Sequence, residues 1–133
     1  MNAVTPISKD LDAYLTPTEV IDSENPSVLE YALKTAGSEK DDISKACALF
    51  AAARDGIVYD PHTPFYLRTH YQASNVLERK SGYCVSKACL LCALGRALGI
   101  PSCLGFADIR NHGASREMAD SIHFFFSVLP KYQ

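Results

Sequence analysis

The residues best suited to chemistry in this sequence are its cysteines, because four of the five lie between positions 84 and 103. Three arrangements fit such a cluster: a metal site, a buried core, or one nucleophile among inert neighbours. Each arrangement places the sulfur atoms differently. The elements that carry the cysteines therefore decide between the three.

A metal site is suggested by spacing alone. Cys84, Cys89 and Cys92 are separated by four and two residues, as in plant-type iron–sulfur proteins, and Cys103 can supply a fourth ligand. In those proteins the ligands lie on a loop around the metal, whereas this stretch is rich in Ala and Leu and predicts a helix. At helical angles the three sulfurs do not face one point. We therefore expect no metal, and the sequence implies no organic cofactor.

Most of the cysteines are expected to be buried in the core. Free cysteine behaves as a small hydrophobic residue and is among the most buried residue types. Cys47, Cys89, Cys92 and Cys103 all lie among Ala, Leu or Phe, so we expect them in the core. Apolar surroundings raise the pKa of a thiol and leave it unreactive.

Cys84 differs from the other cysteines because it follows the expected turn Ser81-Gly82-Tyr83 and opens the predicted helix. The unpaired N–H groups and the positive dipole at a helix start both favour thiolate, which is the nucleophilic form. Gly82 lets the backbone approach closely, leaving room for a substrate carbonyl. The backbone N–H of Cys84 can then face a developing oxyanion. Position alone leaves a nucleophile and a bystander both open.

The elements that must position Cys84 are mostly helical. Asn25 and Pro26 start a helix that ends at Gly37, and an acidic segment starts a second helix that ends at Gly56. The core face expected for the second helix consists of Ile43, Ala46, Cys47, Phe50 and Ala53. Further expected elements are a short strand at 57–59, a helix near 73–77, a buried helix at 84–98, and strands at 103–109 and 121–129.

Helices followed by strands predict an α+β domain. The 133 residues fit one domain, 1–133, with 1–24 as an extended N-terminal arm. The charged fraction of 21% and the net charge of -2 provide no basic stripe for nucleic acid. No apolar run is long enough for a membrane span. An odd number of cysteines and the lack of a secretory segment predict free thiols in the cytoplasm.

Three stretches of the sequence carry a family resemblance: "YLTPTEVIDSENPSVLEYALKTAG", "ALFAAARDGIVYDP" and "ASNVLERKSGYCVSKACLLCALGRALGIPSCLGFADIRNH". They resemble bacterial transglutaminase-like proteins of the papain-related cysteine enzyme superfamily. The resemblance implies a papain-like fold with a central helix, C-terminal antiparallel strands, and a Cys-His-Asp triad. It assigns the nucleophile to Cys84, because the cysteine that opens this helix has that role in the family.

The histidine of the triad is expected at His123, which begins a strand 39 positions after Cys84. In such sites the imidazole takes the thiol proton and an acid orients the imidazole. His123 as an ordinary strand residue is the alternative. His112 is a rival in a turn, and His62 and His70 are expected in solvated loops.

The third member of the triad is missing where the family places it. None of the ten residues after His123 is Asp, Glu or Asn, while Asp108 and Asp120 precede it. The expectation is either an incomplete triad or a piece of a longer enzyme with incomplete C-terminal strands. The exposed edge of "HFFFSV" then favours a homo-oligomer formed through the C-terminal strand.

Two functions follow as hypotheses. The first is a cysteine acyl transferase or hydrolase that attacks a peptide or carboxamide substrate and forms a thioester at Cys84. The second is a catalytically inactive relative that serves for binding or assembly.

Overall fold

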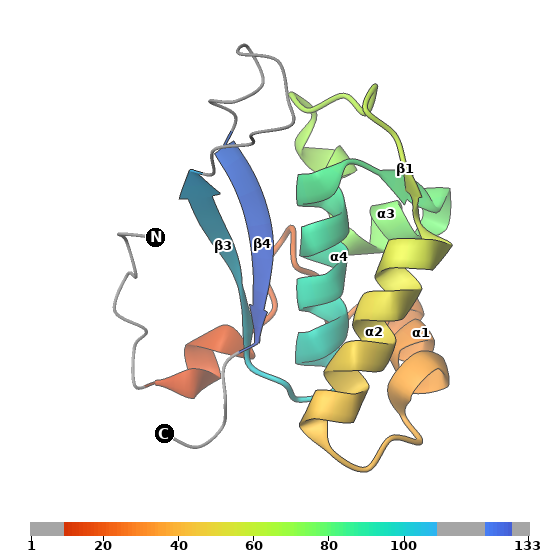
Figure 1. Ribbon diagram of the computed structural model, residues 1–133, viewed down its shortest axis with the longest axis vertical. Helices are drawn as coiled ribbons and strands as arrows, with labels where there is room; N and C mark the ends of the chain where they lie inside the picture. Colours follow the sequence, from red (N-terminus) through yellow and green to blue (C-terminus); the bar gives the residue numbers. More distant parts are fainter. Residues whose placement is uncertain (1–9, 109–121, 129–133) are drawn as a thin grey trace.

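The computed structural model describes residues 10–108 and 122–128 of the chain. Its fold is α+β, as the sequence predicts, with a central helix between other helices on one side and a pair of strands on the other (Figure 1). The elements in chain order are η1 (Leu11–Tyr14), α1 (Pro26–Ala36), α2 (Asp42–Gly56), β1 (Val58–Tyr59), η2 (Arg68–His70), α3 (Ala73–Arg79), β2 (Ser81–Gly82), α4 (Cys84–Ala97), β3 (Ser102–Asp108) and β4 (Ile122–Val128).

The central helix α4 is apolar on nearly all sides and is buried along most of its length. It contacts α1, α2 and α3 as well as both β3 and β4. The fully buried Leu90 and Leu94 are part of the core that these helices share. The predicted buried helix is therefore confirmed, and it forms the middle layer of the fold.

Helix α4 ends at a glycine turn, directly after the predicted helix 84–98. Gly99 has a φ of 76°, a left-handed conformation that favours glycine. The N–H of Gly99 donates to the carbonyl of Arg96 (3.0 Å), and the N–H of Ile100 donates to the carbonyl of Gly95 (2.9 Å). This pair of hydrogen bonds is the Schellman motif, and it directs the chain into β3.

The starts of α1 and α2 follow local capping rules. The Asn25 side chain accepts a hydrogen bond from the N–H of Ser27 (3.0 Å), with Pro26 in the first turn. The Asp41 carboxylate accepts a hydrogen bond from the N–H of Ser44 (2.9 Å), and this bond is the main cause that lowers the pKa of Asp41. Both helix starts agree with the prediction from sequence.

The predicted core face of α2 is right for Ala53 and wrong for Ile43, Cys47 and Phe50. Ile43 is 77% exposed, Phe50 is 52% exposed and Cys47 is exposed, whereas Leu49 and Ala53 are buried. The sequence "ACALFAAA" places small apolar residues on several faces at once, so helical spacing fits more than one choice. Contact with α1 and α4 selects the face that contains Leu49.

Residues 10–24, the described part of the predicted N-terminal arm, are not fully extended. They contain the 3₁₀ turn η1 and then form hydrogen bonds to the rest of the fold. Asp22 accepts hydrogen bonds from the N–H (3.1 Å) and hydroxyl (2.5 Å) of Ser74, in the first turn of α3. Arg96 of α4 donates to the Thr16 carbonyl (2.6 Å). These long-range bonds hold the segment against α3 and α4.

Both C-terminal strands form where the sequence predicts strands. β3 and β4 pair antiparallel, with Ser102 opposite Val128 and Ala107 opposite His123. A second, shorter pair is parallel: Val58 lies opposite Ser81 and Tyr59 lies opposite Gly82. Ser81 and Gly82, expected as a turn, therefore form strand β2. Across residues 10–108 and 122–128, every helix falls short of the length and apolar character needed to cross a membrane.

Candidate functional site

Cys84 is the first residue of α4, and it is exposed although most of its helix is buried. Its N-terminal neighbour Tyr83 occupies the N-cap position without a capping hydrogen bond from its side chain. The sulfur therefore lies at an accessible helix start, where N–H groups and the helix dipole favour an anion. The sequence predicts both the position and the accessibility.

Lys87 fixes the first turn of α4 to the end of α2. Its ammonium group donates hydrogen bonds to the carbonyl oxygens of Ile57 (2.7 Å) and Arg54 (3.1 Å). A cation at the carbonyl end of a helix is favoured by the dipole of that helix. Lys87, which interrupts the apolar pattern of α4 about one turn after Cys84, is thus bound by backbone carbonyls at the end of α2.

Gly82 lies two residues before Cys84 and packs tightly on the same helix. A Cβ atom added at Gly82 would come within 2.9 Å of the Cβ of Ser86. The hydroxyl oxygen of Ser86 is buried and has no hydrogen-bond partner in the part of the chain that the structure describes. The backbone at Gly82 is therefore close to the first turns of α4, at Ser86.

We expect Gly82→Ala to lower the free energy of unfolding by about 2 kcal/mol, because the new methyl group overlaps Ser86 and must displace α4 or β2. Urea unfolding measures the change. The double variant Gly82→Ala, Ser86→Gly removes the overlapping atom, so its loss should be smaller than the sum of the two single losses. Additive losses would contradict the proposed overlap.

Two tyrosines connect the site to the loop that precedes α3. The Tyr83 hydroxyl donates to the Tyr71 hydroxyl (2.5 Å), and the Tyr71 hydroxyl donates to the carbonyl of Phe65. Burial is the largest cause that raises the pKa of Tyr83, and the hydrogen bond to Tyr71 is the second. The Tyr83 hydroxyl therefore stays protonated. Tyr71 was not expected from sequence, because no local pattern links it to a residue twelve positions later.

The other four cysteines differ in burial: two are buried, one is partly buried and one is exposed. Burial raises the pKa of Cys89 to about 12 and the pKa of Cys92 to about 11, and it also raises the pKa of the partly buried Cys103. Cys47, expected in the core, is instead exposed in the middle of α2. Cys89 and Cys92 thus agree with the prediction of inert core thiols. Within the described ranges, no group of three or more His, Cys, Asp or Glu residues is arranged to hold a metal.

His123 is the second residue of β4, and its backbone lies opposite Ala107 of β3. β4 contacts α4, and Figure 1 shows the start of β4 at the same end of the molecule as the first turn of α4. The side chain of His123 lies outside the described residues, as do His112 and Asp120. His62 is exposed, as expected, and His70 lies in η2.

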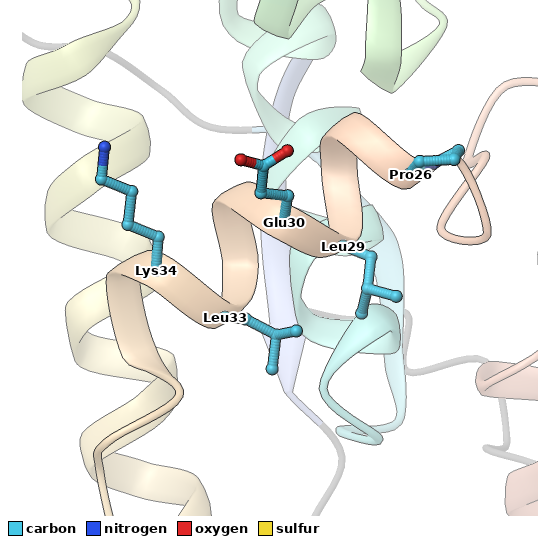
Figure 2. Close-up of a pocket in the computed structure, with 5 residues that line it drawn as sticks. All are labelled: Pro26, Leu29, Glu30, Leu33 and Lys34. Carbon is cyan, nitrogen blue, oxygen red and sulfur yellow. The ribbon is translucent and has the colours of Figure 1, made fainter.

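A surface hollow lies on α1, and it contains no residue of α4. Figure 2 shows two leucine side chains on one side of the helix and a carboxylate and an ammonium on the other. The residues that line the hollow are Pro26, Leu29, Glu30, Leu33 and Lys34. All five belong to α1, so the lining of this hollow includes no residue of the site around Cys84.

Comparisons with known proteins found one family match and a similar solved structure. Residues 30–128 match the family model of the transglutaminase-like superfamily. The crystal structure of a candidate cysteine protease from Cytophaga hutchinsonii has a similar fold, with a TM-score of 0.75, 21% sequence identity and 92% of this chain covered. This chain spans 39% of the length of that protein's chain. No curated protein matches the sequence.

Proposed function

Because the chain belongs to the transglutaminase-like superfamily, we propose that it is a cysteine acyl transferase or amide hydrolase that acts through Cys84. The observation that carries the proposal is an exposed sulfur at the start of a buried helix, at the end of the molecule where β4 begins. Peptides and carboxamides are the proposed substrates. His123 is the proposed base.

In the proposed reaction, the imidazole of His123 takes the proton of the Cys84 thiol, and the sulfur attacks the carbonyl carbon of the amide. The first N–H groups of α4 stabilise the negative charge that develops on the carbonyl oxygen. The C–N bond then breaks, the imidazolium ion returns the proton to the leaving amine, and a thioester remains.

The thioester is resolved by a second nucleophile. The imidazole takes a proton from water or from an amine, which attacks the thioester carbonyl. The C–S bond then breaks, and the thiolate recovers its proton from the imidazolium. Water gives a carboxylic acid, which is hydrolysis, and an amine gives a new amide, which is acyl transfer.

The test compares thiols within one protein. At pH 6, iodoacetamide should alkylate Cys84 about ten-fold faster than Cys47, because only thiolate displaces the iodide and only Cys84 lies at a helix start. Cys89 and Cys92 should stay unmodified because they are buried and their pKa values are raised. Mass spectrometry of the digested protein at successive times gives the four rates.

Cys47 is a matched control because it is also an exposed helical cysteine, but it lies in mid-helix. Equal rates at Cys84 and Cys47 would show that exposure alone governs the labelling. The activated nucleophile would then be absent, and the proposed function would be wrong.

A further inference from the structure

Three consecutive large side chains are exposed in the loop between β1 and α3. Phe65 is 69% exposed, Tyr66 is 75% exposed and Leu67 is 41% exposed. We refer to residues Phe65–Leu67 as the aromatic turn. A single exposed apolar residue is ordinary, whereas adjacent ones that form a patch often mark a binding site.

Hydrogen bonds fix the backbone of this loop to the segment that carries the nucleophile. The N–H of Asp60 donates to the carbonyl of Gly82 (2.9 Å), which holds the start of the loop. The Phe65 carbonyl accepts from Tyr71, whose hydroxyl accepts in turn from Tyr83, the residue before Cys84. Two hydrogen bonds in series therefore connect the aromatic turn to the direct neighbour of Cys84.

The loop lies at the end of the molecule where α4 begins, as Figure 1 shows. The rings of Tyr71 and Tyr83 contact each other edge-to-face, with centroids 5.8 Å apart, and strengthen this link. The aromatic turn is thus linked through two hydrogen bonds to the residue before Cys84 and lies at the end of the molecule where α4 begins, while its own side chains are exposed.

The aromatic turn consists of two aromatic residues and a leucine, so none of its three side chains is charged. The rings of Phe65 and Tyr66 contact each other edge-to-face with centroids 5.8 Å apart. The next residue, Arg68, is paired with Glu19 at 3.0 Å, so its charge is compensated. Such a surface favours an apolar ligand group over an ionic one.

We propose that the aromatic turn binds an apolar side chain of the acyl donor, next to the carboxamide that Cys84 attacks. The substrate class is then a peptide or carboxamide with an aromatic or large aliphatic group beside the reacting amide. The inference rests on the proposed function of Cys84 and makes Phe65 and Tyr66 specificity-determining residues.

The experiment measures alkylation of Cys84 by two chloroacetamides that differ in one group. In each, the thiolate displaces chloride from the same carbon, but N-benzylchloroacetamide carries an aromatic ring and N-methylchloroacetamide does not. We expect the ratio of the benzyl rate to the methyl rate to be about ten-fold higher at Cys84 than at Cys47, because burying the ring stabilises the encounter.

Variants assign the preference to the aromatic turn. Phe65→Ala and Tyr66→Ala, singly and together, should reduce the ratio at Cys84 towards that at Cys47. Phe50→Ala is the matched control, because Phe50 is also an exposed aromatic residue but lies on α2. Circular dichroism verifies that each variant is folded.

Two results would overturn the inference: a ratio at Cys84 equal to that at Cys47 in the unmodified protein, or a ratio that persists in the double variant. With either result, Cys84 can still react faster than Cys47 with the methyl reagent, and the proposed function then stands. A slow methyl reaction at Cys84 would instead contradict the proposed function. The ratio and the absolute rate therefore test the two proposals separately.

Discussion

Cys84→Ala is expected to reduce turnover of peptide or carboxamide substrates by at least about 10⁴-fold, because no thioester can form without the sulfur. A screen of peptide amides, with and without a primary amine as acceptor, measures turnover by ammonia release and mass spectrometry. The loss should fall on kcat, since the alanine leaves the binding surface nearly unchanged. Cys84 is exposed, so the free energy of unfolding should change little.

Cys47→Ala is the control for this experiment, because it removes an exposed thiol from α2 and should leave turnover intact. Turnover that survives in Cys84→Ala would refute the thioester mechanism. A folded protein that turns over no substrate and whose Cys84 labels no faster than Cys47 would instead favour a binding or assembly role.

His123→Ala should lower kcat/KM by about 10³-fold, because the proposed base would be lost while the nucleophile remains. In the same variant, the alkylation of Cys84 should be slow at pH 6. The rate should recover as the pH rises, because solvent can then deprotonate the thiol without the imidazole. A profile of iodoacetamide labelling against pH, from pH 5 to pH 9, shows this shift. A residue with only a structural role in β4 would not move the profile.

His112→Ala is the matched control for His123, since both histidines follow Cys84 in the sequence. It should leave both kcat/KM and the labelling profile unchanged. If His112→Ala produces the losses expected of His123→Ala, the assignment of the base is wrong and His112 takes that role.

The parts of the fold that sequence predicts well are those that local chemistry determines. Asn25 and Pro26 set the start of α1, and Gly99 sets the end of α4 through its left-handed backbone. The same local reasoning places Cys84 at a helix start. Each of these features depends on residues within one helical turn of each other, so the sequence contains the whole cause.

The parts that sequence misses depend on contacts between distant segments. The buried face of α2 is selected by α1 and α4, and the alanine-rich sequence does not choose between Leu49 and Phe50. The bond between Asp22 and Ser74 joins residues 52 positions apart. The bond between Tyr71 and Tyr83 spans a helix and a strand. No periodicity or capping rule reports such partners.

The site shows the same division. A helix start is a local feature, so the position of Cys84 could be predicted from sequence, and the family resemblance makes it the proposed nucleophile. The loop that flanks it could not, because its position depends on the pairing of β1 with β2 and on the two tyrosine hydroxyls. The proposed base is an intermediate case: its strand is predicted from local pattern, but its neighbours come from the register with β3.

The bonds from Lys87 to the carbonyls of Arg54 and Ile57 have a consequence for dynamics. If the first turn of α4 frays, an ammonium ion and two carbonyl groups lose their partners together, which makes fraying costly. The end of α2 and the segment around the sulfur should therefore open as one cooperative unit. Their amide protons would then exchange with solvent deuterium at matched rates, although some thirty residues separate them in the chain.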